Sequence, residues 1–136
     1  MRNYRVPTLT IAGSDSSGGA GEQADLKTFS AIGTYGMSVI TAVTAQNTEG
    51  VFAVEELSGE IIKSQIKAVF DDIEPAAVKI GMVSSPEIIV DIVNTIKKYN
   101  PSFLVVDPVM ISKSGYSLLK PEAKENLIKY LIPMAY

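Results

Sequence analysis

The feature that most constrains the fold is a glycine-rich segment near the start of the chain, GSDSSGGAG at residues 13–21. Four glycines and three serines in nine residues favour turns, so this segment cannot continue the apolar stretch TLTIA at residues 8–12, which predicts a buried strand. A helical pattern follows from Gly21 to about Ala31. The start of such a helix has backbone N–H groups without helical partners, which suits a polar or anionic ligand. The alternative is a tight connection that only packs the helix against the strand.

The rest of the chain alternates between strand and helix patterns with short links. We predict strands at residues 37–45 and 103–107, both buried, and at 77–80, an edge strand or flap at 51–57, and helices at 58–73, 85–99 and 121–132. This order predicts a three-layer α/β/α fold with a mainly parallel sheet, organised as a single domain over residues 1–136. The last helix leads to a point where another strand is expected, so we expect the fold to be truncated at its C-terminus.

The composition excludes several kinds of site. The chain has no cysteine and no histidine, which excludes disulfides, thiol nucleophiles, Ser-His-Asp systems and histidine or cysteine metal sites within it. A net charge of -3 without a basic run argues against nucleic acid and anionic membranes as partners. The apolar run near the N-terminus is too short for a signal peptide or a membrane span, so we expect a cytoplasmic protein.

Three polar side chains are candidates for a site at the carboxyl ends of the strands, where parallel sheets bind ligands. Asp25, about one turn into the predicted helix, is either a solvated or helix-dipole acid or a carboxylate that accepts a hydrogen bond from a ligand hydroxyl or amine. Gln46 offers a donor and an acceptor side by side, which matches an aminopyrimidine edge, or it only caps a strand. Asp107 is either a ligand for Mg²⁺ or the start of an Asp-Pro turn.

Two apolar residues and one lysine near the same edge have open roles. Met82 and Val109 each follow a strand and could form walls around a flat ring, although core packing is the commoner role for such residues. Lys79 lies within a predicted strand, where it is either an edge charge or the buried partner of an acid.

A dinucleotide-binding motif is a weaker alternative for the glycine-rich segment. Residues 19–24 match G-x-G-x-x-A, but six further residues separate the preceding strand from this motif. Gln46 also stands where the motif expects an acid. A phosphate-binding loop of the G-x-x-x-x-G-K-[ST] type is absent, because Lys27 lies inside the predicted helix.

Longer motifs carry a family resemblance. AGSDSSGGAG, QADLKTFSAIGTYGMSVITAVTAQNT, VKIGM and VVDPVMISKSG occur in this order. Together they resemble the hydroxymethylpyrimidine/phosphomethylpyrimidine kinases of thiamine biosynthesis, which have a ribokinase-like fold, and the resemblance covers about residues 8–133. It implies ATP-dependent phosphorylation of 4-amino-5-hydroxymethyl-2-methylpyrimidine and then of its monophosphate, with Mg²⁺. It also suggests a homodimer.

The same resemblance assigns site residues. It implies that the pyrimidine contacts Gly13, Asp25, Gln46, Met82 and Val109, with Gln46 reading the aminopyrimidine edge. It places Asp107 near the metal and the phosphates. It assigns no catalytic residue here, because the C-terminal half of the family, with most ATP contacts and the anion hole, has no counterpart in this chain.

Two departures from the family qualify these expectations. Glu22 stands where similar sequences carry an apolar residue, on the same helix face as Leu26 and Phe29, where a charge is costly to bury. Without the C-terminal half, we expect the isolated 136 residues to lack kinase activity. A non-catalytic pyrimidine-binding module and a pyridoxal kinase remain alternatives, which ligand binding would distinguish.

Overall fold

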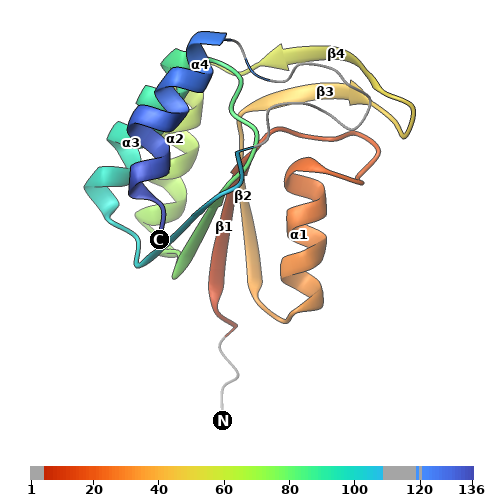
Figure 1. The fold of residues 1–136 in the computed structure, drawn as a ribbon. Coiled ribbons are helices and arrows are strands. Elements are labelled where there is room, and N and C mark those ends of the chain that lie inside the picture. The colour runs from red at the N-terminus through yellow and green to blue at the C-terminus, as the bar shows by residue number, and fades with distance from the viewer. Residues whose placement is uncertain (1–4, 109–118, 120) are drawn as a thin grey trace.

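The computed structural model describes residues 5–108, 119 and 121–136 (Figure 1). Its elements follow the expected alternation of strands and helices. They are β1 (Pro7–Ala12), α1 (Gly21–Ala31), β2 (Tyr35–Ile40), β3 (Ala42–Gln46), β4 (Val51–Glu56), α2 (Gly59–Phe70), β5 (Ala77–Ile80), α3 (Pro86–Tyr99), β6 (Phe103–Val106) and α4 (Pro121–Asn126), followed by a π-helical turn (Leu127–Leu131) and a 3₁₀ turn (Ile132–Met134).

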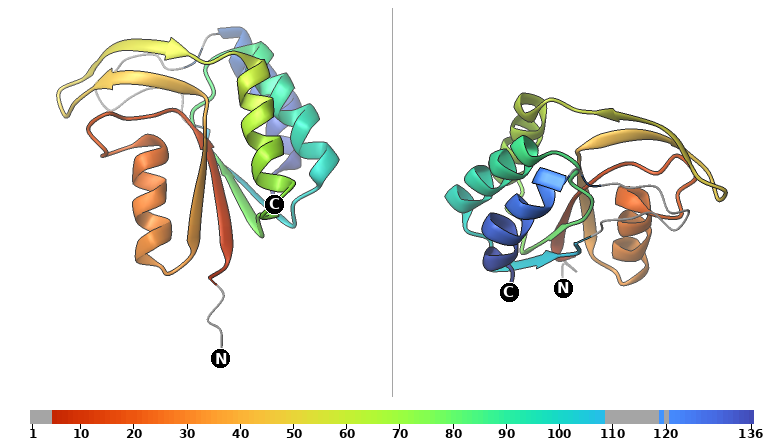
Figure 2. Two further views of the ribbon diagram at one scale, coloured as in Figure 1. Left: turned by 180° about the vertical axis from the view of Figure 1, so that it is seen from behind. Right: turned by 45° about the horizontal axis from the view of Figure 1, so that its top comes forward.

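Four parallel strands form the main sheet in the order β2-β1-β5-β6. Helix α1 covers one face of this sheet, and α2, α3 and α4 lie on the other, as both views show (Figures 1 and 2). The predicted three-layer arrangement is therefore confirmed. From β1 the chain first adds β2 on one side and later returns to add β5 on the other. The carboxyl ends of β1 and β5 thus form a topological switch point, where such sheets usually bind ligands.

The hydrophobic core lies between the sheet and the layer of α2, α3 and α4. Side chains of β1 alternate across the sheet, so Leu9 and Ile11 are fully buried in this core while Thr10 points toward α1. Ile66 of α2 and Ile92 of α3 are among the helix residues that pack against them. This packed core holds the strands of the main sheet in place, and the candidate site lies at their carboxyl ends.

The ends of two helices follow the expected capping rules. The hydroxyl of Ser58 accepts a hydrogen bond from the N–H of Ile61 at the start of α2, and that of Ser85 accepts one from Ile88 at the start of α3. Asn100 ends α3 in the left-handed conformation. Among the described residues, no helix is both long and apolar enough to cross a membrane.

The prediction of one buried strand over residues 37–45 is wrong. Strand β2 ends at Ile40, and Thr41 turns the chain, with its N–H donating to the carbonyl of Ala12 at 3.0 Å. Strand β3 then leaves the main sheet and pairs antiparallel with β4. The resulting ribbon extends across the carboxyl end of the sheet above α1 (Figure 1). The flap expected at residues 51–57 is therefore confirmed as β4, and β3 is its partner.

The expectation of a fully buried strand at residues 103–107 is also wrong. Strand β6 lies at the edge of the sheet, and its alternating pattern leaves Phe103 and Val105 exposed. In the described part of the chain, no helix covers the face of β6 that lies on the α1 side of the sheet (Figures 1 and 2). The predicted last helix is α-helical only as far as Asn126 and continues as π and 3₁₀ turns.

Candidate functional site

The glycine-rich loop, residues 13–20, folds around the buried carboxylate of Asp15. This carboxylate accepts hydrogen bonds from the N–H and the hydroxyl of Ser17 at 2.9 and 2.8 Å. It also accepts from the N–H groups of Gly19 and Ala20 at 3.0 and 2.8 Å. These amides bind an internal anion, so the expectation that the loop offers them to an anionic ligand is wrong for these three groups.

The electrostatics of Asp15 follow from this cage. Burial alone would raise the pKa of its carboxyl group. The hydrogen bonds from Ser17, Ala20 and Gly19 outweigh that effect and hold the pKa below the ordinary value of 3.8. Asp15 is therefore ionised at neutral pH and fixes the shape of the loop.

Helix α1 fixes the other side of the loop. The side-chain oxygen of Gln23 accepts from the N–H of Asp15 at 2.8 Å, and its nitrogen donates to the hydroxyl of Ser14 at 2.7 Å. Gly21 has a φ of 60°, and any side chain there would overlap the carbonyl oxygen of Gly13. Glycine is therefore required where the loop enters the helix.

Strand β3 borders the loop and carries Gln46 beside it. The N–H of Gln46 donates to the hydroxyl of Ser16 at 2.8 Å, and this hydroxyl donates to the carbonyl of Gln46 at 2.6 Å. The hydroxyl of Thr44 donates to the carbonyl of Ser14 at 2.7 Å and lies 3.4 Å from the side-chain oxygen of Gln46. The structure thus places the carboxamide of Gln46 next to the glycine-rich loop.

Gly13 and Met82 meet at the topological switch point. Gly13 follows β1 and Met82 follows β5, and the terminal methyl group of Met82 lies against Gly13, where a side chain would overlap it. The carbonyl of Met82 accepts a hydrogen bond from the hydroxyl of Thr41 at 3.0 Å, which ties it to the start of the ribbon. Gly13 and Met82 therefore meet at the carboxyl ends of β1 and β5, and Gln46 contacts the loop that follows Gly13.

Asp25 is an internally paired carboxylate, so its alternative as a solvated helix acid is wrong. Its side chain is 18% exposed, and both of its oxygens accept from the ammonium of Lys79, at 3.1 and 2.9 Å. The hydroxyl of Thr10 donates to the same carboxylate at 2.6 Å. Lys79 is consequently the partner of an acid, which decides between its two sequence-based alternatives.

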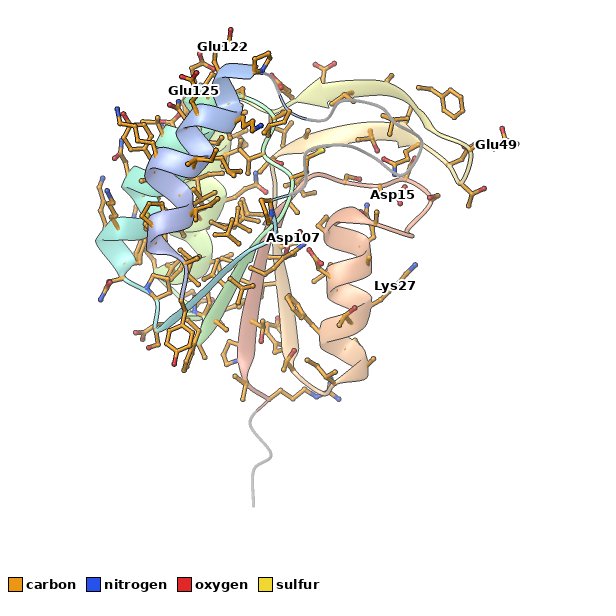
Figure 3. The ribbon with its side chains drawn as sticks, in the orientation of Figure 1. Asp15, Lys27, Glu49, Asp107, Glu122 and Glu125 are labelled. Carbon is orange, nitrogen blue, oxygen red and sulfur yellow. The ribbon has the colours of Figure 1, made fainter. Side chains whose placement is uncertain are left out.

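Asp107 lies at the carboxyl end of β6 with a side chain that is 56% exposed (Figure 3). Its N–H donates to the carbonyl of Ile80 at 2.8 Å, and its carboxylate lies 4.0 Å from the ammonium of Lys79. Among the described residues, no three acidic side chains gather into a metal site. One exposed carboxylate still fits Mg²⁺, which commonly binds one or two protein carboxylates together with substrate phosphates and water. Val109 lies outside the described residues.

Glu22 is buried at the start of α1. Its side chain is only 6% exposed, and its Oε2 atom has no hydrogen-bond partner within the described part of the chain. The desolvation expected from the sequence is therefore confirmed.

Sequence reasoning missed the internal role of Asp15 and the link from Ser16 to Gln46. A signal for the first was present, because an aspartate followed by Ser-Ser-Gly-Gly is typical of turns in which the carboxylate binds nearby backbone amides. The link from Ser16 to Gln46 depends on the β3–β4 ribbon, and the sequence predicted a single long strand in place of β2 and β3.

Comparison with known proteins identifies the family. The sequence model of phosphomethylpyrimidine kinase matches residues 15–136. This chain belongs to that family. A hydroxymethylpyrimidine/phosphomethylpyrimidine kinase from Rhizobium meliloti (strain 1021) is 58% identical over 127 residues, covering 93% of this chain and 47% of that protein. A solved phosphomethylpyrimidine kinase from Clostridium difficile 630 is 82% identical with a TM-score of 0.92, over 97% of this chain and 57% of that one.

A related kinase with another substrate shares the fold. The pyridoxal kinase of Staphylococcus aureus, solved with pyridoxal, is 39% identical with a TM-score of 0.84, over 96% of this chain and 47% of that one. The same enzyme has also been solved with ADP. The chain spans about half the length of the curated relatives it matches.

Proposed function

We propose that residues 1–136 form a single domain that binds the acceptor in a hydroxymethylpyrimidine/phosphomethylpyrimidine kinase. The observation that carries this proposal is the meeting of Gly13 and Met82 at the switch point, with Gln46 tied to the same loop. A small flat heterocycle needs an apolar wall and an edge of donors and acceptors. Met82 would supply the wall, and the carboxamide of Gln46 would supply the edge.

The remaining predicted residues have roles in the same proposal. Asp25 would accept a hydrogen bond from the acceptor while Thr10 and Lys79 hold its carboxylate. Val109 would complete the apolar wall, as the family resemblance implies. Asp107 would be a ligand of Mg²⁺, which would neutralise the charge of the transferred phosphate.

The proposed reaction moves the γ-phosphoryl group of ATP to the hydroxymethyl oxygen of the pyrimidine. A second transfer adds a phosphoryl group to the monophosphate. Phosphoryl transfer depends on groups that position the reactants and stabilise charge. We propose that turnover requires the groups found in the half of the relatives that this chain does not match, so the 136 residues alone bind the acceptor without phosphorylating it.

Isothermal titration calorimetry tests this proposal with three ligands in separate titrations. Hydroxymethylpyrimidine is expected to bind the 136-residue chain, whereas pyridoxal binds more weakly and ATP alone gives no measurable heat. The absence of pyrimidine binding would contradict the proposal. ATP turnover by these 136 residues alone would contradict the assignment of catalysis to the unmatched half. If the natural protein in its full length binds the pyrimidine but has no kinase activity, the non-catalytic module is favoured.

Pyridoxal kinase is the second candidate, because the Staphylococcus aureus enzyme shares the fold at 39% identity. The 82% identity to the Clostridium difficile phosphomethylpyrimidine kinase favours the pyrimidine. A ratio of kcat/KM values for the two acceptors, measured on the natural protein in its full length, decides between them.

We further propose that the protein is a cytoplasmic homodimer. Val43 and Phe52 on the ribbon are exposed and provide apolar surface for such a contact. Light scattering should then give twice the chain mass.

A further inference from the structure

Lys79 occupies an unusual position for a charged residue. It lies on β5, an inner strand of the parallel sheet, with a side chain that is only 22% exposed. Parallel inner strands are normally apolar on both faces, and burying a lysine is costly unless its charge is paired. A residue of this kind needs a compensating role, and its contacts indicate which one.

The ammonium group of Lys79 is held from three sides. Both oxygens of Asp25 accept from it, and the carboxylate of Asp107 lies 4.0 Å away. On the third side, a Cβ atom added to Gly81 would come within 2.8 Å of the ammonium nitrogen. Because Gly81 has no side chain, the ammonium group has room next to it at the carboxyl end of β5.

The Asp25 carboxylate is hydrogen-bonded to groups from two other elements. Helix α1 supplies the carboxylate, whereas its partners Thr10 and Lys79 come from β1 and β5, the two strands of the switch point. Three elements thus fix one carboxylate at the place where the acceptor is proposed to bind. Without the lysine, a partly buried carboxylate would keep only the hydroxyl of Thr10 and would turn toward water.

We propose that Lys79 is a positioning residue for the acceptor: it holds the Asp25 carboxylate in the orientation that binds the pyrimidine. This inference rests on the proposed function. Lys79 acts through Asp25, so its loss should weaken binding of the acceptor more than binding of the nucleotide, which Lys79 reaches only through the more distant carboxylate of Asp107. Loss of the Thr10 hydroxyl should also weaken binding of the acceptor, but by less, because it removes one hydrogen bond to Asp25 and no charge.

A double-mutant cycle on the natural protein in its full length tests the proposal. Dissociation constants for hydroxymethylpyrimidine and for ATP are measured by calorimetry for the unsubstituted protein, Lys79→Met, Asp25→Asn and the double variant. Lys79→Met should raise the Kd for the pyrimidine about tenfold or more, and less than about twofold when Asp25 is already asparagine. KM for the acceptor should rise in the same proportion, whereas KM for ATP should rise by a smaller factor. Thr10→Val should raise the pyrimidine Kd about threefold.

The control variant is Lys63→Met, which removes another lysine that pairs with an aspartate, Asp91, on the surface of α2 and α3. It should leave both dissociation constants unchanged. If Lys79→Met does not fold, Lys79→Arg and Thr10→Val still test the proposal, because each disturbs the Asp25 carboxylate while the charge at residue 79 remains.

An equal loss of pyrimidine and ATP affinity would overturn the inference, as would a Lys79→Met effect that is the same with and without Asp25. Pyrimidine binding that neither Lys79→Met nor Thr10→Val weakens would overturn this inference alone. Absence of pyrimidine binding by the unsubstituted protein would overturn the proposed function together with it.

Discussion

The Ser16 hydroxyl and the backbone of Gln46 hold each other through two hydrogen bonds, one in each direction, although 30 residues separate them. This pair joins the glycine-rich loop to the β3–β4 ribbon. It therefore sets where the carboxamide of Gln46 lies relative to the switch point.

Ser16→Ala should weaken pyrimidine binding by about threefold to tenfold, because each hydrogen bond contributes about 0.5–1.5 kcal/mol. The melting temperature should change little, since Ser16 is exposed and water can replace the hydroxyl. Calorimetry and thermal denaturation measure the two effects. Ser64→Ala is a suitable control, because that exposed hydroxyl donates to the carbonyl of Glu60 within α2. Equal pyrimidine affinity in both variants would show that the link does not position Gln46.

Asp15→Asn should lower the free energy of unfolding by about 2 kcal/mol at pH 7, because an amide cannot accept all the hydrogen bonds that the carboxylate accepts. The pKa of Asp15 is lowered in the folded protein, so its stabilising effect is fully present above the unfolded value of about 3.8. The effect is lost as the pH falls through the folded pKa. Urea denaturation gives the free energy of unfolding of Asp15→Asn and of the unsubstituted chain. The difference between these two free energies should be smaller at pH 3 than at pH 7. A difference that grows on acidification would contradict this account of the loop.

Glu22→Leu should raise the free energy of unfolding by about 1–3 kcal/mol, because it removes a buried carboxylate with an unpaired oxygen. Glu60→Leu is a matched control, since Glu60 is also the second residue of its helix, α2, but is exposed. That control should change stability by less than about 0.5 kcal/mol. Chemical denaturation of both variants gives the comparison. A less stable Glu22→Leu protein would show that the carboxylate has a favourable role that the described contacts do not reveal.

Local sequence rules predicted those parts of the fold that depend on neighbouring residues. The serines that cap α2 and α3 could be identified because a cap bonds within its own first turn. The break at Thr41 could not, because β-branched residues on both sides of it suit a strand. The contacts that hold Thr41 at the break come from residues distant in sequence: its hydroxyl donates to the carbonyl of Met82, and its carbonyl accepts from the N–H of Leu57.

The candidate site divides in the same way. The type and order of its residues placed Gly13 and Met82 at the carboxyl ends of strands, and the structure brings these two together. Gln46 was expected to follow a strand of the main sheet, but it ends β3 of the ribbon and contacts the glycine-rich loop. The pairing of Asp25 with Lys79 joins residues 54 positions apart, so no local pattern specifies it. Only the position of β5 beside β1 in the sheet makes this contact possible.

We propose that the glycine-rich loop and the carboxamide of Gln46 bind the same small heterocycle. The most direct test is the dissociation constant of hydroxymethylpyrimidine for Gln46→Met and for the unsubstituted protein, measured by calorimetry. Methionine keeps the size of the side chain but loses both the donor and the acceptor. We expect Gln46→Met to raise this dissociation constant about tenfold to a hundredfold and to leave the melting temperature unchanged. A change of less than about twofold would contradict this proposal.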